Sequence, residues 1–422
     1  MSIADLYESR KNESQWNTSY PLDPNDWAAY RDSAPLPFDQ DQQLSFYIHI
    51  PFCKQLCSFC EYTRMLCPGE NTQKRYLQAI AHDIVEFKKR YDHLTLEGFD
   101  IGGGTPTALS DPNFSFLMEI FRNAKEGVNL SNDFEPSIEA TFSTLSVAKL
   151  KNMAANGLHR LSLGVQSSCH AIMNKHRRNC TGEPQMAEWL AKAWDAGIRK
   201  INLDFMYGLE GQDTMTIDKD LETIGRLHPQ QVTLYELRTN MIKTKGAYTK
   251  EELSAQYTKY YRGLTSMGYK ARYGQNTFSK DTIDQGVSSY LRMRMLHGAS
   301  YKGFGLSAQS MSKYGVSYNI GKLSPQPKQH LNKDSYPEEY TYLLPPRELA
   351  FKYLAIAAYN GSFNIDRLNA FGIDLKDIKE SLDYCLSQRL LYVDNQHQIC
   401  ITSEGFVHYG AIFSLFHSPA KS

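Results

Sequence analysis

The sequence predicts an α/β protein: a partial barrel of six β/α units followed by a smaller α+β domain. Six short apolar segments have the composition of β-strands, and amphipathic stretches such as Gln73–Tyr91 and Glu183–Ala196 lie between them. Alternation of this kind favours parallel β/α units. The expected strands are Phe46–Pro51, Gly98–Gly102, Ser137–Thr141, Arg160–Val165, Lys200–Met206 and Gln231–Leu237. Six units fit a partial form of the eight-unit barrel, whose chemistry lies at the C-terminal strand ends.

The chain outside the six units divides by composition. Residues 1–44 are polar and contain four prolines, which predicts an irregular arm with at most short helices. Residues 45–322 would form the barrel with an extension, in which 250–270 is helical and 269–310 is irregular or β. Residues 323–346, rich in Pro, Gln and Lys over much of their length, are expected to form a linker to a C-terminal domain over 347–422.

The C-terminal domain has the order helix, helix, hairpin. We expect helices over Arg347–Tyr359 and Asp374–Gln388, and a hairpin from Leu391–Val393 and Gln398–Thr402. This order is winged-helix-like, and nucleic-acid binding is one use of that shape. Because residues 378–409 carry no basic stripe, we favour a cap that covers a substrate.

Composition excludes several classes of protein. The 422 residues include 46 basic and 46 acidic ones, so no bulk charge favours nucleic acid or a charged membrane surface. No run of 18 apolar residues and no signal-peptide pattern is present, so we expect no membrane span and a cytoplasmic location. Eight cysteines in a chain of this length do not suggest a disulfide scaffold.

Three cysteines directly follow the first predicted strand. Cys53, Cys57 and Cys60 have the spacing C-x3-C-x2-C. Three thiolates can hold three irons of a [4Fe–4S] cluster and leave the fourth iron open to a small molecule. A structural zinc site needs a fourth ligand, and the nearest spare thiol is Cys67, seven residues on. The remaining alternative is three ordinary buried cysteines in a loop.

The run Tyr-Ile-His-Ile-Pro-Phe-Cys-Lys-Gln-Leu-Cys-Ser-Phe-Cys over residues 47–60 resembles the radical S-adenosylmethionine (SAM) enzymes. More narrowly, it resembles the oxygen-independent coproporphyrinogen III oxidase family, which includes a porphyrinogen decarboxylase, a haem chaperone, and SAM-dependent methylases and cyclopropanases. The resemblance extends from about residue 45 to the C-terminus. It implies a radical SAM barrel, a [4Fe–4S] cluster on the three cysteines, SAM on the open iron, and a one-electron donor such as flavodoxin or ferredoxin.

Motifs at the ends of the later strands resemble the SAM-contacting motifs of the same family. The resemblance assigns SAM contacts to Gly103, Gly104, Thr105, Glu139, Gln166, Arg178, Asp204 and Gln309. Each also admits an ordinary structural interpretation, such as a turn glycine or a solvated acid. Arg177 precedes Arg178, so the register of that assignment could shift by one residue.

Tyr47 and His49 lie in the first strand, ahead of the cysteines. Tyr47 precedes the first cysteine by six residues, as the SAM-contacting tyrosine of the oxidase does. In a regular strand His49 points to the same face, so we assign both residues to the catalytic site. An ordinary core histidine is the alternative. Cys67, Cys169 and Cys180 match no ligand position of the family.

The resemblance leaves the reaction open among three activities. Gly104, Thr105, Gln166, Arg178 and Asp204 match positions that the oxidase uses for a second SAM. Glu61 and Tyr62 follow the last cysteine, where the oxidase has Gly-Cys and the chaperone Asp-Phe. We therefore expect methyl or methylene transfer from a second SAM to a small organic substrate. The alternatives are oxidative decarboxylation of coproporphyrinogen III and a haem-carrying chaperone.

Overall fold

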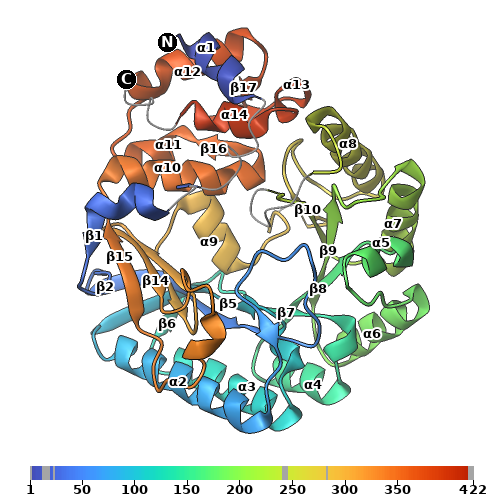
Figure 1. Cartoon of the computed structure of the whole chain (residues 1–422), viewed down its shortest axis with the longest axis vertical. Coiled ribbons are helices and arrows are strands. Elements are labelled where there is room, and N and C mark those ends of the chain that lie inside the picture. Colours follow the sequence, from blue (N-terminus) through green and yellow to red (C-terminus); the bar gives the residue numbers. More distant parts are fainter. Residues whose placement is uncertain (1, 12–19, 22–23, 240–245, 282–283, 417–422) are drawn as a thin grey trace.

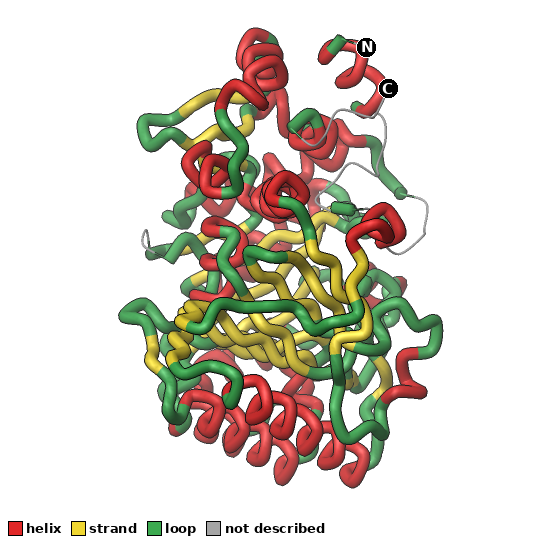
Figure 2. Tube along the Cα trace, turned by 90° about the vertical axis from the view of Figure 1, so that its left-hand side faces the viewer, coloured by secondary structure: helices red, strands yellow, loops and turns green. Residues whose placement is uncertain are grey.

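The computed structural model describes residues 2–11, 20–21, 24–239, 246–281 and 284–416. A curved sheet carries helices on its outer side. A smaller domain, formed mainly by the C-terminal helices, lies at one end of the molecule (Figures 1 and 2). Within the described residues no helix has the length and apolar character needed to cross a bilayer. The irregular arm expected over 12–19 and 22–23 lies outside the described residues.

The six predicted strands are present and lie side by side in one parallel sheet. They are β2 (Asp41–Ile50), β5 (His93–Gly103), β7 (Ser137–Ala140), β8 (Arg160–Gln166), β9 (Lys200–Tyr207) and β10 (Gln231–Glu236). They pair in that order, each parallel to the next. The described strands form an open path from β1 (Arg31–Asp32) to β11 (Thr277–Ser279), which confirms the α/β class and the six-unit arrangement. All six carboxyl ends therefore meet at one edge of the sheet.

Amphipathic helices follow the strands and cover the outer face of the sheet (Figure 1). They are α2 (Glu70–Lys88), α3 (Asp111–Lys125), α4 (Val147–Ala155), α5 (His170–Lys175), α6 (Glu183–Asp195), α7 (Thr214–Leu227) and α8 (Lys250–Ser266). In α2 the buried residues Tyr76, Ile80, Ile84 and Phe87 recur every three or four positions and form one apolar stripe. Short elements in the connecting loops are η3 (Pro106–Ala108), η4 (Phe142–Thr144), β3 (Phe52–Cys53), β4 (Met65–Leu66) and β6 (Asn129–Leu130).

The sheet continues beyond β2 with strands whose limits and pairing the sequence did not reveal, although residues 269–310 were expected to be irregular or β. β12 (Tyr301–Phe304) pairs in parallel with β2 on the side away from β5. Antiparallel strands follow: β13 (Gln309–Ser312), β14 (Gly315–Asn319), β15 (Glu338–Leu343) and β1. The expectation of a linker is therefore wrong over Glu338–Leu343, and η5 (Pro327–His330) precedes that strand. The arm contains the short helices α1 (Ile3–Arg10) and η2 (Pro24–Tyr30), as expected, but also the strand β1, which was not expected.

Composition gave the wrong expectation for residues 338–343 and for part of the arm, because both segments are polar and pack against a partner that is distant in sequence. Trp27 of the arm is 1% exposed, and its ring packs 5.8 Å from that of Tyr342 in β15. Neither segment has a buried face without the other, so neither carries a strong periodic signal of its own. The domain limits drawn from the sequence remain a prediction.

Helix α9 (Ser289–His297) lies at the centre of the ring of strands (Figure 1). It packs against β5 so closely that a Cβ placed on Gly98 would lie 2.3 Å from the backbone nitrogen of Tyr290. Ser288 caps the helix through the backbone N–H of Leu291 and donates to Asp100 at 2.6 Å. The barrel interior is thus partly filled by a helix from outside the six units.

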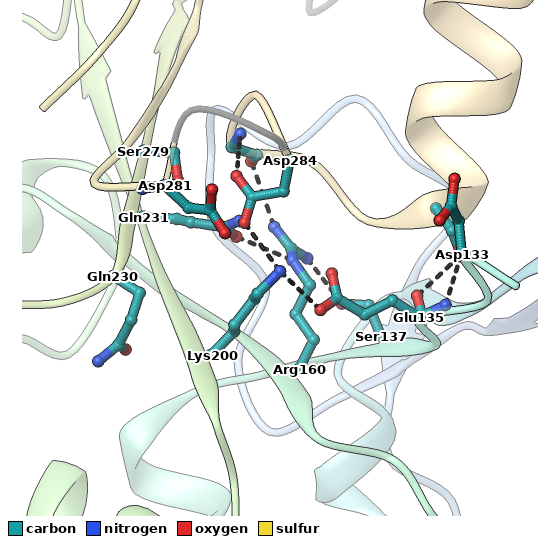
Figure 3. Close-up of polar contacts among 12 residues, drawn as sticks. Asp133, Glu135, Ser137, Arg160, Lys200, Gln230, Gln231, Ser279, Asp281 and Asp284 are labelled. Carbon is teal, nitrogen blue, oxygen red and sulfur yellow. Dashed lines mark hydrogen bonds and ion pairs between the residues drawn. The ribbon is translucent and has the colours of Figure 1, made fainter.

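A buried polar network holds the loop before α9 against the amino-terminal ends of the strands (Figure 3). The ammonium of Lys200 lies 2.8 Å from Glu135 and 2.9 Å from Asp284. Arg160 donates to Gln231 at 2.9 Å and to Ser137 at 2.7 Å. The network anchors the floor of the barrel and the start of α9.

The C-terminal domain agrees with the predicted helix-helix-hairpin order. The helices are α10 (Pro346–Ala357), α11 (Ile365–Ala370), α12 (Leu375–Ser387), α13 (Ser403–Phe406) and α14 (Tyr409–Ser414), with η6 (Ala358–Asn360) after α10. β17 (Leu391–Val393) and β18 (Gln398–Ile401) form the expected hairpin, and β16 (Ser362–Asn364) adds a third strand. Helix α1 packs here, where Tyr7 stands 5.8 Å from the ring of Tyr384 and Arg10 donates to the carbonyl of Ser414 at 2.7 Å.

Candidate active site

One cavity of about 1050 Å³ gathers every site residue that the sequence predicted. It lies at the carboxyl ends of the parallel strands and reaches α9 and α10. Its lining includes Tyr47, His49, Cys53, Cys57, Cys60, Gly103, Gly104, Thr105, Glu139, Gln166, Arg178, Asp204 and Gln309. Arg178 lines the cavity and Arg177 is not part of its lining, which favours Arg178 as the candidate. Cys67, Cys169 and Cys180 lie outside the lining.

The three cysteines share one part of the cavity wall. Cys53 ends β3, and Cys57 and Cys60 follow in a loop held by Arg64, which donates to the carbonyl of Cys57 at 2.6 Å. Burial raises the pKa of the Cys53 thiol to about 11, and a hydrogen bond from Thr105 opposes that rise. Within the described ranges, no group of three His, Cys, Asp or Glu side chains is arranged to coordinate a single metal ion.

These donors fit an iron–sulfur cluster. In a [4Fe–4S] cluster each cysteine binds a different iron, so the thiolates do not converge on a single point as they do around one ion. The residues that would hold the cluster are Cys53, Cys57 and Cys60. Arg178 lies 3.6 Å from the sulfur of Cys57 and would balance part of the thiolate charge.

Glu139, at the end of β7, lies directly over the glycines that end β5. Its carboxylate accepts the backbone N–H of Gly103 at 3.0 Å. A Cβ on Gly102 would lie 2.6 Å from the carboxyl carbon of Glu139, so only glycine leaves room for this approach. Burial, and then the nearby charge of Asp204, raises the pKa of Glu139 to about 7.

Two further carboxyl groups, of Asp100 and Asp204, line the cavity with Glu139. Asp204 accepts hydrogen bonds from Ser162 at 3.1 Å and from Asn202 at 2.7 Å. Burial raises the pKa of Asp204, and it raises the pKa of Asp100 to about 7. The guanidinium of Arg160 lowers the pKa of all three acids. Three carboxyl groups around one arginine make this part of the cavity suited to a cationic ligand.

Gln166 and Arg178 come together through a glycine that sequence reasoning did not single out. A Cβ on Gly164 would lie 2.8 Å from the amide nitrogen of Gln166 and 2.9 Å from the guanidinium of Arg178. Arg178 donates to the carbonyl of Gly164, and Gln166 has a positive φ of 72°. Gly164 therefore lets both polar side chains pack over the end of β8.

Tyr47 and His49 face the same side of β2, as predicted. Their rings are 6.2 Å apart, and Tyr47 stacks on Tyr290 at 5.5 Å. The Nε2 atom of His49 lies 2.9 Å from the carbonyl of Thr63, and a carbonyl requires that this nitrogen carry the proton. Burial lowers the pKa of His49 to about 4, so the ring is neutral near pH 7.

Gln309 connects several aromatic and basic groups at the other side of the cavity. Its Oε1 accepts from Tyr301 at 2.6 Å and from Arg294 at 3.3 Å, and its Nε2 donates to Tyr318 at 2.9 Å. The structure shows that the side chain positions Arg294.

Sequence reasoning missed the basic residues of the cavity. Arg294 comes from α9, Lys322 from the turn after β14, and Lys352 from α10. Arg238, after β10, pairs with Glu61, the residue that follows the last motif cysteine. No local motif marks these positions, because each reaches the cavity only through the packing of a different element.

Comparison with known proteins finds similarity to radical SAM proteins. The model of the radical SAM superfamily matches residues 47–224. The haem chaperone HemW of Haemophilus influenzae is 25% identical over 393 residues, which cover 88% of this chain and 97% of that protein. The oxygen-independent coproporphyrinogen III oxidase of Escherichia coli is 30% identical over 199 residues, which cover 46% of this chain and 42% of that protein.

A solved structure shows the same fold. The coproporphyrinogen III oxidase HemN from Escherichia coli superposes with a TM-score of 0.73 at 22% identity, and the match covers 90% of this chain and 91% of that one. The shared architecture therefore includes the C-terminal domain as well as the barrel.

Proposed function

This chain belongs to the radical SAM superfamily and to its coproporphyrinogen III oxidase-like family, and we propose that it cleaves SAM reductively to act on an organic substrate. The family implies a [4Fe–4S] cluster and SAM, which together supply one-electron cleavage to a deoxyadenosyl radical when bound. The observation that carries the proposal is the single cavity lined by three cysteines, Glu139, Asp204 and the glycine loop.

The chain's own residues bind, orient and exclude water. Cys53, Cys57 and Cys60 would hold the cluster, and Glu139 would accept hydrogen bonds from the ammonium of SAM. Asp204 is suited to ribose hydroxyls because its carboxylate, within β9, lines the cavity. The packed floor below and the cap above restrict water around the reacting atoms.

The proposal extends to the reaction and its substrate, for which three candidates are compared. The relatives reported above carry the names of haem chaperones and coproporphyrinogen III oxidases, which supports decarboxylation or haem carriage more than methyl transfer. Similarity to the haem chaperone over nearly its whole length makes haem carriage a specific second candidate. A second SAM remains part of the methyl-transfer hypothesis, with Gln166 and Arg178 as its binding residues. We expect a flavodoxin or ferredoxin as reductant and a cytoplasmic setting.

A product assay distinguishes these activities. Reconstituted protein with dithionite and SAM is expected to release deoxyadenosine in every enzymatic case. Carbon dioxide from coproporphyrinogen III would identify decarboxylation, and methylthioadenosine or S-adenosylhomocysteine would identify transfer from a second SAM. Tight haem binding without substrate-dependent cleavage would identify a carrier. Absence of both deoxyadenosine and haem binding would contradict the proposed function.

Replacing Glu139 by glutamine is expected to weaken SAM binding about tenfold or more at pH 8. The reason is that a hydrogen bond to a charged group contributes roughly 1.5–3 kcal/mol. The affinity of the wild type should also fall by up to about tenfold from pH 8 to pH 6, since the carboxylate becomes protonated below its pKa of about 7. Equilibrium dialysis under anaerobic conditions measures both effects.

The control for Glu139→Gln is Glu119→Gln, which removes the same charge from an exposed position of α3. The control should bind SAM as the wild type does at each pH. Because Asp100 and Asp204 also have raised pKa values, some pH dependence should remain in Glu139→Gln. Unchanged affinity in Glu139→Gln would show that this acid does not contact SAM.

A further inference from the structure

Three basic side chains line the cavity on the side that α10 covers. They are Arg294, Lys322 and Lys352, which lie 58 residues apart at most in sequence but belong to three separate elements. Over the described part of the chain, none of the three forms an ion pair. Their charges are therefore not balanced by carboxylates among those residues.

The partners of these cations are neutral. Lys352 donates to the backbone carbonyl of Tyr20 at 2.8 Å. Arg294 donates to the hydroxyl of Tyr290 and to the amide oxygen of Gln309, each at 3.3 Å. The Nε atom of Arg294 is buried and has no hydrogen-bond partner. Lys322 stands 5.8 Å from the ring centroid of Tyr318. Each group keeps unused hydrogen-bonding capacity.

The effect of these cations on one another's pKa values also indicates that their charges are not balanced. Burial, and then the charges of Arg294, Lys322 and Arg238, lower the pKa of Lys352 to about 7. Burial also lowers the pKa of Lys322, followed by Arg294 and Arg238. No carboxylate opposes either change. A cavity that gathers like charges at such a cost is stabilised by a ligand of opposite charge.

Lys200 of the floor network lies outside the cavity lining, and carboxylates balance its charge. It lies between two carboxylates, those of Glu135 and Asp284 (Figure 3). Lys200, which is paired, and Arg294, which is not, are connected through α9. The floor network anchors the start of this helix, and Arg294 lies within it. The unbalanced charges occur where a ligand can enter.

We propose that Arg294, Lys322 and Lys352 form an anion-binding subsite, which holds at least two carboxylate or phosphate groups of the substrate against the cap. This inference rests on the proposed function only in calling the anion a substrate. Arginine suits a forked contact with a planar oxyanion, and the two lysines suit point contacts with further oxygens. The acidic part of the cavity, at Glu139 and Asp204, would take the cationic SAM, so the two ligands are sorted by charge.

Anion binding without SAM tests the subsite directly. Thermal unfolding of the reconstituted protein is followed with increasing tricarballylate, a tricarboxylate, and with pyrophosphate, each against sodium chloride at equal ionic strength. At least one of the two anions is expected to raise the Tm beyond the salt control, because a ligand that binds only the folded state stabilises it. Which anion acts tells a carboxylate substrate from a phosphorylated one.

Three variants and one control locate the effect. Lys352→Gln, Arg294→Gln and Lys322→Gln should each raise the apparent Kd for the active anion by about tenfold or more. Lys322 faces the cavity but is the most exposed of the three side chains, so its variant is the safeguard if one of the more enclosed variants does not fold. Lys333→Gln removes the same charge from an exposed position outside the cavity and should keep the wild-type response.

Two outcomes would overturn the subsite: no response beyond salt in the wild type, or a wild-type response in all folded variants. Deoxyadenosine release is measured on the same preparations. Protein that cleaves SAM but ignores both anions refutes the subsite and leaves the proposed function standing. Protein that binds the anion through these residues but never cleaves SAM refutes the function and leaves the subsite standing.

Discussion

Replacing Cys57 by alanine is expected to abolish both the cluster and SAM cleavage. The wild type, reconstituted under anaerobic conditions, should contain about four irons and four sulfides per chain and show a brown absorbance. With two thiolates left in the cavity wall, the variant should lose nearly all of this iron. Iron and sulfide analysis, absorbance and deoxyadenosine release measure the loss. Cys53→Ala and Cys60→Ala should behave alike.

Cys67→Ala is the matched control for the cysteine variants. Cys67 lies seven residues after Cys60, outside the cavity lining, where its sulfur accepts from Gln73 at 3.4 Å. It should retain the iron content of the wild type, because its thiol has no role in the cluster. If the triple variant of Cys53, Cys57 and Cys60 kept its iron and absorbance, the ligand assignment would be wrong.

Replacing Arg160 by methionine is expected to destabilise the fold by about 3 kcal/mol or more. Arg160 is 3% exposed, and its guanidinium bonds to Gln231, Ser137 and the carbonyl of Gly286. Methionine fills similar space but leaves these acceptors without a donor. It also removes the cation that stabilises the carboxylates of Asp100, Glu139 and Asp204 in the cavity. Denaturant unfolding measures the change.

A second readout separates the electrostatic effect from lost packing. Because Arg160 lowers the pKa of Glu139, its removal should move the pH profile of SAM binding to higher pH. Arg199→Met removes an exposed arginine one residue before Lys200 and should change stability by no more than about 0.5 kcal/mol. A loss below about 1 kcal/mol in Arg160→Met, or an unmoved pH profile, would contradict the role assigned to the floor network.

Local sequence determined the repeating part of the fold and the residues at its strand ends. β2, β5, β7, β8, β9 and β10 each bury an apolar segment of their own, so their periodicity is visible without knowledge of any partner. Parallel order then forces their carboxyl ends together, which is why Cys53, Glu139 and Asp204 share one cavity as expected. Helices α10 and α12 and the β17–β18 hairpin were equally predictable, since each carries local helix or turn signals, whereas α11, α13, α14 and β16 were not predicted.

Tertiary structure alone decided the strands β12, β1 and β15 and the basic side of the cavity. β12 is four residues long and becomes a parallel strand only because the edge of β2 is free to pair with it. Arg294, Lys322 and Lys352 carry no motif, because a cation on a helix or turn looks like any solvated residue until its surroundings are known. Their proximity depends on α9 entering the barrel and on α10 covering it. Local sequence therefore determined the acidic and cysteine-containing part of the site, which lies on and next to the repeating strands. Packing between α9, α10 and the turn after β14 decided the basic part.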